Sequence, residues 1–212
     1  MFRRISLVWI ALSLIGVPAC LAATSVEKIR NEKVIVTEDT LAQGETASFA
    51  GNRPGMIVFL YGNKAAIIPG HGQPRKESVK RGDTLLQSAD EKSIRNEGSS
   101  ALSFVRIEFL AAGLNETWGM TGLSPNYKLL LENQYARAYD IRIPAQAFEP
   151  QHTHHDRVVV CLAGAKLEHI LPNGEKQPST LKTGEVVWRL GATHIGHNMD
   201  HSDLWVIAIE PK

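Results

Sequence analysis

The sequence is poor in cysteine, with only Cys20 and Cys161 among its 212 residues. Cys20 lies in an N-terminal segment that we expect to be cleaved, which would leave Cys161 without a partner and exclude an internal disulfide. An exported chain without a disulfide must be held together by its hydrophobic core. Because Cys161 is flanked by apolar residues, we expect it to fill the core rather than to bind a ligand or react.

The sequence also lacks an excess of charge. Its formal net charge is +1, and no cluster of Lys or Arg is interleaved with aromatic residues. This balance gives no reason to expect nucleic acid or an acidic surface as a partner. There is no P-loop, no dinucleotide-binding glycine fingerprint, no pair of Cys-x-x-Cys zinc motifs and no nucleophile elbow. The function must therefore be sought in other residues.

The main uninterrupted apolar run lies at the N-terminus, from Ile5 to Val17, after Arg3 and Arg4 and before a small-residue segment that ends at Ala23. A positive start, an apolar middle and a small-residue end predict a secretory signal peptide at residues 1–23. The run is short for a membrane span, which needs about 20 residues. We therefore expect a periplasmic or secreted bacterial protein with no transmembrane segment in its mature form. The alternatives are an uncleaved anchor and a lipoprotein anchored at Cys20.

The second part of the chain repeats the first part in one constant register. Glycines at matching positions are the informative pairs, because tight turns need their backbone freedom. The identical pairs include Gly62 with Gly164, Gly72 with Gly174, Gly82 with Gly184, Asn31 with Asn133, Asn96 with Asn198 and Glu108 with Glu210. Chance identities would not keep one register over so long a stretch. The repeat predicts two units, residues 31–110 and 133–212, joined by a linker at 111–132.

Both units read as short strands separated by turn signals. Apolar runs such as Met56–Tyr61 and Arg157–Leu162 are bounded by Gly-Asn, Pro-Gly, Gly-Asp and Asn-Gly steps. Helical signal is scarce: we expect one brief helical turn at residues 25–31, and several glycines argue against a long helix in the linker. Regularly spaced short strands predict an all-β chain built of sandwiches or barrels.

The stretch from Gln151 to Arg157 carries the strongest chemical signal. His152 and His154 are separated by one residue, so on a β-strand their side chains point to the same face, with backbones about 7 Å apart. That spacing lets both imidazoles converge on one cation. His194 lies one strand pair later, and we expect its ring to meet the other two inside a small barrel.

These residues resemble the two motifs of the cupin superfamily, which are G-x5-H-x-H-x3,4-E-x6-G and G-x5-P-x-G-x2-H-x3-N. His152-Thr153-His154 supplies the H-x-H of the first motif, and Gly191-Ala192-Thr193-His194 supplies the G-x2-H of the second, with Asn198 after it. Gln146 stands in place of the opening glycine, Arg157 in place of the glutamate and Arg189 in place of the proline. The resemblance covers about residues 31–212 and implies a bicupin, two tandem jelly-roll barrels.

In the first unit the frame of the motifs is kept while the ligands are missing. Gly44 keeps the opening glycine, but Ala50 and Asn52 occupy the H-x-H positions, Gly55 the glutamate position and Lys92 the third histidine position. The resemblance therefore implies that the first barrel is a degenerate copy without metal ligands, and that His152, His154 and His194 of the second barrel bind a divalent transition metal. Neutral imidazole suits Fe, Mn, Zn, Ni or Cu, so the metal is not identified.

Arg157 is the main departure from the family pattern, and three interpretations follow. Asp156 would turn inward as a fourth ligand, or Arg157 would clamp an anionic ligand beside the metal, or metal binding would be lost and a polar pocket would remain. The other histidines, among them His155, His169 and His197, are expected on the surface or in loops. Phe148, Trp188 and Trp205 are expected in the core or the pocket wall, and Asn198 is expected to bond to backbone or to a group behind the ligands.

Three functions stay open on this sequence. The first is a metal-dependent cupin enzyme of dioxygenase or isomerase type that acts on a small, anionic molecule, with Arg157 orienting the substrate. The second is a binding or sensing cupin without turnover, which the degenerate first unit and the missing glutamate favour. The third is a structural role in the cell envelope. The resemblance also implies pairing into a homodimer through barrel edges.

Overall fold

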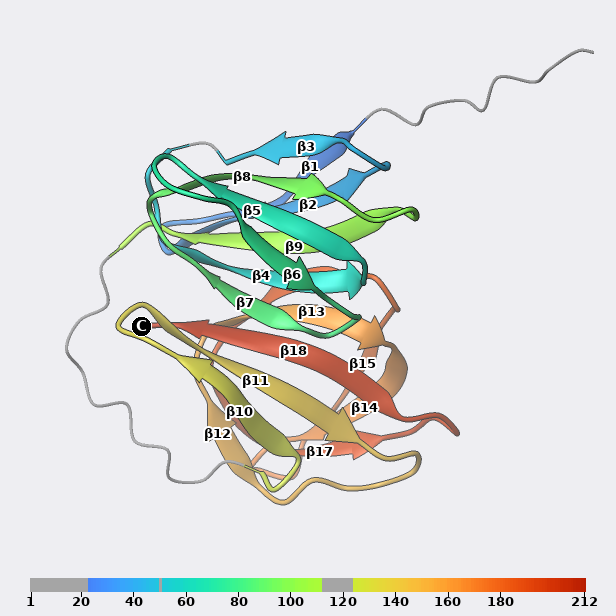
Figure 1. Ribbon diagram of the computed structural model, residues 1–212. Helices are drawn as coiled ribbons and strands as arrows, with labels where there is room; N and C mark the ends of the chain where they lie inside the picture. The colour runs from blue at the N-terminus through green and yellow to red at the C-terminus, as the bar shows by residue number, and fades with distance from the viewer. Residues whose placement is uncertain (1–22, 50, 112–123) are drawn as a thin grey trace, which may run out of the picture.

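The computed structural model describes residues 23–49, 51–111 and 124–212, and this part of the chain is all-β. Its strands form four sheets stacked as layers, with the N-terminal half of the chain in two neighbouring layers and the C-terminal half in the other two (Figure 1). The predicted signal peptide falls almost entirely outside the described residues. Within them, no helix is long and apolar enough to cross a bilayer.

The N-terminal half consists of two sheets. The first has the order β1-β2-β9-β4-β7 and the second the order β3-β8-β5-β6, and all pairings in both are antiparallel. The strands are β1 (Thr24–Arg30), β2 (Val34–Leu41), β3 (Thr46–Ser48), β4 (Gly55–Tyr61), β5 (Lys64–Pro69), β6 (Arg75–Ser78), β7 (Thr84–Gln87), β8 (Glu91–Asn96) and β9 (Leu102–Phe109).

The C-terminal half repeats this plan strand for strand. Its sheets have the orders β10-β11-β18-β13-β16 and β12-β17-β14-β15. The strands are β10 (Tyr127–Glu132), β11 (Ala136–Ile143), β12 (His152–His154), β13 (Arg157–Ala163), β14 (Ala165–Ile170), β15 (Lys176–Leu181), β16 (Val186–Arg189), β17 (Ala192–Asn198) and β18 (Leu204–Pro211). The predicted all-β, two-barrel fold is confirmed.

Two strands lie in segments for which the sequence predicted a helical turn or a linker. Residues 25–31 were expected to form a helical turn, and that prediction is wrong, because β1 runs through them and pairs with β2. Strand β10 falls inside the range 111–132 that was expected to be linker, and it pairs with β11. Strand β1 pairs with the outer edge of β2, and β10 pairs with the outer edge of β11. The backbone groups along those edges of β2 and β11 are thereby hydrogen-bonded instead of facing solvent.

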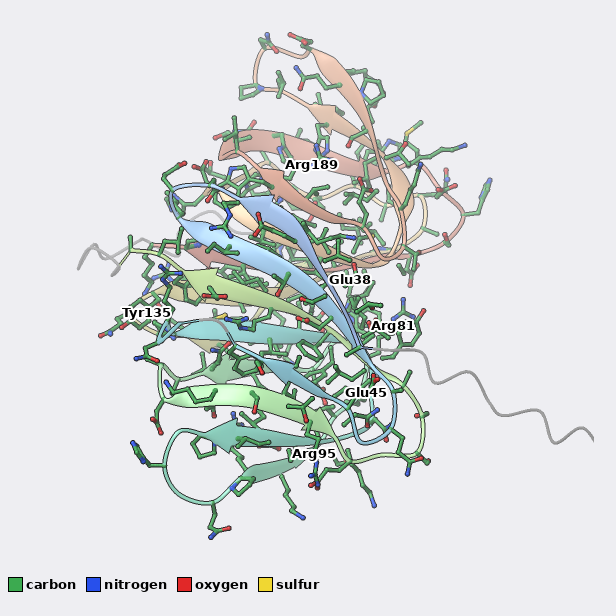
Figure 2. All side chains as sticks on the ribbon, turned by 90° about the horizontal axis from the view of Figure 1, so that it is seen from above. Glu38, Glu45, Arg81, Arg95, Tyr135 and Arg189 are labelled. Carbon is green, nitrogen blue, oxygen red and sulfur yellow. The ribbon has the colours of Figure 1, made fainter. Side chains whose placement is uncertain are left out.

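The two halves share a central core. Strands β4 and β13 are buried on both faces, as their unbroken apolar sequences indicate. The reason is that the two five-stranded sheets pack against each other, so that Val58, Met56 and Ile107 lie in one cluster with Val158, Val160 and Ile209. Tyr135, which Figure 2 shows where the two halves meet, stacks on Phe109 with ring centroids 6.1 Å apart.

Each half also has its own interior between its two sheets. In the N-terminal half this interior is built around Phe59, Phe104, Ile67 and Ile94, all fully buried. In the C-terminal half it contains the fully buried Cys161 together with Val206 and Leu167. The expectation that Cys161 fills the core is confirmed by its burial, which also raises the pKa of its thiol to about 11.

Candidate functional site

A cavity of about 280 Å³ opens into the interior of the C-terminal half. One part of its wall is apolar and includes Ile141, Ile143, Val159, Leu167, Leu181, Leu204 and Val206. The other part carries polar side chains, namely Tyr127, Glu149, His154, Arg157, His169, Gln177, Ser179, Arg189 and His194. Figure 2 shows Arg189 among the strands of this half, well away from Glu45 and Arg95 of the other half. An apolar cavity with a few convergent polar groups is typical of a small-molecule site.

The structure brings the three predicted histidines together. His152 and His154 are both buried while Thr153 between them is exposed, as strand alternation requires. His152 lies directly opposite His194 in the pairing of β12 with β17. The ring centroid of His194 is 4.8 Å from that of His152 and 5.1 Å from that of His154, and the rings of His152 and His154 are 6.1 Å apart.

A fourth histidine joins this group. The ring centroid of His169, on β14, is 4.6 Å from that of His194, and its Nδ1 is buried. The prediction that His169 lies on the surface is therefore wrong. It fails because β14 pairs with β17, which directs alternate residues of both strands into the same interior. His197 does face away from the cavity. Its ring stacks on that of Phe148, with the ring centroids 3.7 Å apart. Phe148 is 59% exposed, so its predicted place in the core or the pocket wall is also wrong.

Burial keeps the imidazoles of His154, His169 and His194 neutral. It lowers the pKa of His154 to about 2, with the positive charge of Arg157 as the next cause. Burial also lowers the pKa of His194 to about 3, helped by His169 and His152, and it lowers the pKa of His169. A neutral imidazole keeps a lone pair on one ring nitrogen, which is the form that binds metals or accepts a hydrogen bond.

Hydrogen bonds orient two of the rings. Nδ1 of His154 lies 3.1 Å from the carbonyl oxygen of His155, and Nδ1 of His152 lies 2.9 Å from that of Pro150. A carbonyl oxygen only accepts, so Nδ1 carries the proton in both rings, and the lone pair of a neutral ring is then on Nε2. Backbone carbonyls fix metal-binding imidazoles in the same way.

Arg157, the predicted orienting residue, lies beside these rings on β13 and is 9% exposed. Its Nη1 donates a 2.6 Å hydrogen bond to the hydroxyl of Tyr127, which in turn lies 3.2 Å from Nε2 of His152. In the tautomer of His152 with its proton on Nδ1, Nε2 accepts this hydrogen bond and the Tyr127 hydroxyl donates it. The Arg157–Tyr127–His152 chain therefore occupies the lone pair that His152 would offer a cation.

Asp156 does not act as the missing carboxylate. Its Oδ1 accepts a 2.7 Å hydrogen bond from the backbone N–H of Gly191, and its Oδ2 lies 3.8 Å from Nζ of Lys33. These contacts hold the side chain at the rim of the barrel. The interpretation in which Asp156 turns inward as a fourth ligand is therefore not supported by its contacts.

Sequence reasoning missed a second carboxylate, Glu149, which lies just ahead of β12. Its side chain is 4% exposed and lines the cavity, and burial raises its pKa against the pull of His152, Ser124 and Arg157. A Cβ atom at Gly196 would lie 2.5 Å from its Oε2, so the glycine provides the space that the carboxylate fills. The repeat carried a signal for this pair, since Ala47 and Ile94 occupy the matching positions.

The donor set suits a metal, although the side chains are not arranged around one. Three neutral imidazoles and a buried carboxylate are ligands that transition metals accept. Among the residues that the structure describes, however, no group of three or more His, Cys, Asp or Glu side chains is placed so that it could hold a metal ion. The Tyr127–His152 hydrogen bond is one physical reason, because it competes for a ligand atom.

No family model and no curated protein sequence matches this chain. Solved structures do match it. A cupin 2 conserved barrel domain protein from Leptotrichia buccalis is 16% identical, with a TM-score of 0.58 over 91% of this chain and 90% of its own. AerE from Microcystis aeruginosa is 13% identical, with a TM-score of 0.61 over 84% and 88%. Oxalate decarboxylase from Bacillus subtilis is 11% identical, with a TM-score of 0.63 over 89% and 71%.

This chain has the cupin fold. The predicted resemblance to the cupin superfamily is thus confirmed at the level of the fold, and at these identities the fold is all that the likeness establishes. The cavity lies in the C-terminal barrel and is lined by residues of both predicted cupin motifs.

Proposed function

We propose that the C-terminal barrel binds a small organic anion beside a divalent transition metal held by His152, His154 and His194. The observation that carries this proposal is the close approach of three buried imidazoles, whose ring centroids lie 4.8–6.1 Å from one another. They lie next to a cavity that Arg157 also lines. Proteins bury a charged side chain only where a partner compensates the charge.

Each residue has a distinct part in this proposal. His154 offers Nε2 directly, whereas His152 has to exchange the hydroxyl of Tyr127 for the metal. A bound metal would supply Lewis acidity toward an oxygen of the ligand. Arg157 would bind the carboxylate of the ligand through its guanidinium, whose forked N–H groups match that geometry. One structural neighbour is named oxalate decarboxylase, an enzyme of a small carboxylate, which is consistent with this ligand class.

A second candidate is an anion-binding cupin without metal. It is favoured by Arg157 at the glutamate position and by the hydrogen-bond chain that occupies Nε2 of His152. A guanidinium near a dication is repelled unless an anion lies between them. In this alternative the histidines act as neutral polar groups of the cavity wall, and the bound anion meets Arg157 alone.

Metal analysis of the full chain separates the two candidates. After expression in medium supplemented with Fe, Mn, Zn, Ni and Cu, we expect close to one equivalent of one metal per chain, measured by inductively coupled plasma mass spectrometry. The double variant His152→Ala/His154→Ala should lose it. The matched control is His71→Ala/His201→Ala, which removes two exposed histidines and should keep the metal. A wild-type metal content no higher than that of His152→Ala/His154→Ala would leave the metal-free candidate.

We also propose that the chain is exported and processed near Ala23. The support is the three-part pattern of residues 1–23. The structure begins its first strand at Thr24, directly after that pattern. Intact-mass measurement of the protein from a bacterial host should show a chain that starts at Ala23 or Thr24 and is recovered from the periplasm. A lipidated N-terminal Cys20 would instead identify a lipoprotein, and an unprocessed chain would contradict the proposal.

A further inference from the structure

We infer that the ligand of the C-terminal cavity is a small hydroxy acid with an apolar body, and that Glu149 binds its hydroxyl group while Arg157 binds its carboxylate. This inference rests on the proposed function, because it uses the same cavity and the same arginine. It adds a second polar contact and a shape, and so names the class of ligand.

The first observation is a cluster of buried polar atoms without partners. In the described part of the chain, Oε1 of Glu149, Nε of Arg157 and Nδ1 of His169 are buried and make no hydrogen bond. They come from three separate segments, the loop before β12, strand β13 and strand β14. All three side chains line the same cavity. Because an unpaired buried polar atom costs about 1–3 kcal/mol, such atoms collected at one cavity indicate a polar ligand.

The second observation is that Glu149 is held in place from its other side. Its backbone N–H donates a 2.7 Å hydrogen bond to the carbonyl oxygen of Gly196. Its Oε2 occupies the space above Gly196. One carboxylate oxygen is thus packed against protein, while the other, Oε1, is left for a group in the cavity.

The charges of the cavity favour an anion. Of the described residues that line it, Arg157 and Arg189 are cationic and Glu149 is the acidic one. A carboxylate beside Arg157 would balance this excess. The wall formed by Ile141, Ile143, Leu204 and Val206 offers the remainder of the ligand an apolar surface. A ligand of this cavity is therefore an acid on an aliphatic or aromatic body.

A hydroxyl is the functional group of the ligand that best suits Oε1 of Glu149. A hydroxyl both donates and accepts, so it bonds to Oε1 whether the carboxyl group is ionised or protonated. An ammonium group only donates, so it would require that Oε1 itself carry no proton. A hydroxyl on the carbon next to the carboxylate would reach Glu149 from a ligand already bound at Arg157.

The test compares three probes that share one body: 2-hydroxy-4-methylpentanoate (each enantiomer), 4-methylpentanoate and leucine. Binding to the full chain is measured by isothermal titration calorimetry, with the metal content of each sample determined in parallel. We expect one enantiomer of the hydroxy acid to bind at least about 10-fold tighter than 4-methylpentanoate, because a hydrogen bond to a charged group contributes about that factor. Leucine should bind no tighter than 4-methylpentanoate.

Variants assign the preference to Glu149. Glu149→Leu should reduce the ratio of the two acid affinities to about one, while binding of 4-methylpentanoate is retained. The matched control, Glu175→Leu on the exposed turn before β15, should keep the wild-type ratio. Should Glu149→Leu fail to fold, the wild-type ratio alone decides the question.

The outcomes separate this inference from the proposed function. Equal affinity for the two acids in the wild-type protein overturns the hydroxyl contact and leaves anion binding at Arg157 standing. Tighter binding of leucine also overturns it, in favour of an amino acid. No binding of any probe overturns both. Discrimination by a preparation that contains no metal supports this inference and contradicts only the metal part of the proposed function.

Discussion

The two barrels share a scaffold and differ in what fills it. Asn96 and Asn198 occupy matching positions, and each donates from Nδ2 to a pair of backbone carbonyls, at Leu41 and Ser100 in one barrel and at Ile143 and Ser202 in the other. The β-bulge after Phe59 in β4 has its counterpart after Cys161 in β13. Turns, bulges and buried asparagines therefore specify the barrel, and they are the parts that both copies retain.

The residues that fill the interiors, by contrast, differ between the two barrels. Phe59 lies opposite Phe104 in the N-terminal barrel, where the C-terminal barrel has Cys161 opposite Val206. Ile67 lies opposite Ile94, where the C-terminal barrel has His169 opposite Gly196. Large apolar side chains close one barrel, and smaller or polar ones leave a cavity in the other.

The positions of the metal motif differ in the same direction. Asn52 and Lys92 stand where the C-terminal barrel has His154 and His194, and Nζ of Lys92 donates a 2.6 Å hydrogen bond to Oδ1 of Asn52. The ammonium group of a lysine has no lone pair to offer a cation, and here it occupies one of the two lone pairs of the Asn52 oxygen. Ala50, which stands at the first histidine position, lies outside the described residues. The two barrels therefore differ at the motif positions in their interiors, while their scaffold is the same.

The largest effect that would test this comparison is expected from the two core residues at matching positions. Phe59→Ala should lower the free energy of unfolding by about 3–5 kcal/mol, because it empties a filled interior. Cys161→Ala should cost only about 1 kcal/mol, since it removes one small group. Both values come from urea denaturation followed by circular dichroism. Equal costs would contradict the view that only one barrel is filled.

Much of the scaffold and part of the site were readable in the sequence. Gly82 and Gly184 both adopt φ of 85°, the conformation that makes a glycine at a turn hard to replace, and this is why the repeat was visible as glycine pairs. The alternation of His152, Thr153 and His154 placed two rings on one face without knowledge of the fold. The approach of His194 followed from the family motif rather than from periodicity.

The rest depended on tertiary contacts. Tyr127 reaches His152 only because β10 pairs along β11, and the sequence placed β10 in a linker. Glu149 occupies a variable position of the first cupin motif, between Gln146 and His152, and lies in a loop. The paired change from Ala47 and Ile94 to Glu149 and Gly196 was the signal in the sequence, and it becomes meaningful only when the strands are known to be neighbours.

That paired change can be reversed to sharpen the comparison. Gly196→Ile alone should destabilise the protein by about 1–3 kcal/mol, because its side chain would overlap the carboxylate of Glu149. Adding Glu149→Ala should recover most of this loss, since it restores the combination that the N-terminal barrel already uses. The double-mutant cycle measures the coupling, which residues in direct contact show at about 0.5–3 kcal/mol. Additive costs would show that the two positions do not share one space.

The smallest effect is expected from pH. His154 and His194 have folded-state pKa values of about 2 and about 3, well below the usual value of 6.5. As pH falls below 6.5 the unfolded chain takes up protons that the folded chain does not, so stability that is present above pH 6.5 is lost on acidification. For these two residues together the loss between pH 7 and pH 6 is about 1.4 kcal/mol.

The buried carboxyl groups of Glu149 and Glu210 act in the opposite sense. Burial raises their pKa, so they favour the folded state at low pH and weaken it as pH rises. The histidine contribution is therefore measured as the difference in pH-dependent stability between the wild-type protein and a histidine variant. His194→Asn, in chelator-treated protein, should remove about half of the 1.4 kcal/mol loss, whereas His201→Asn at an exposed position should change nothing. The N-terminal barrel has no buried histidine in its described residues, so this histidine contribution belongs to the C-terminal barrel alone. An unchanged slope in His194→Asn would mean that His194 is solvated in the folded protein, which is incompatible with a closed histidine cluster.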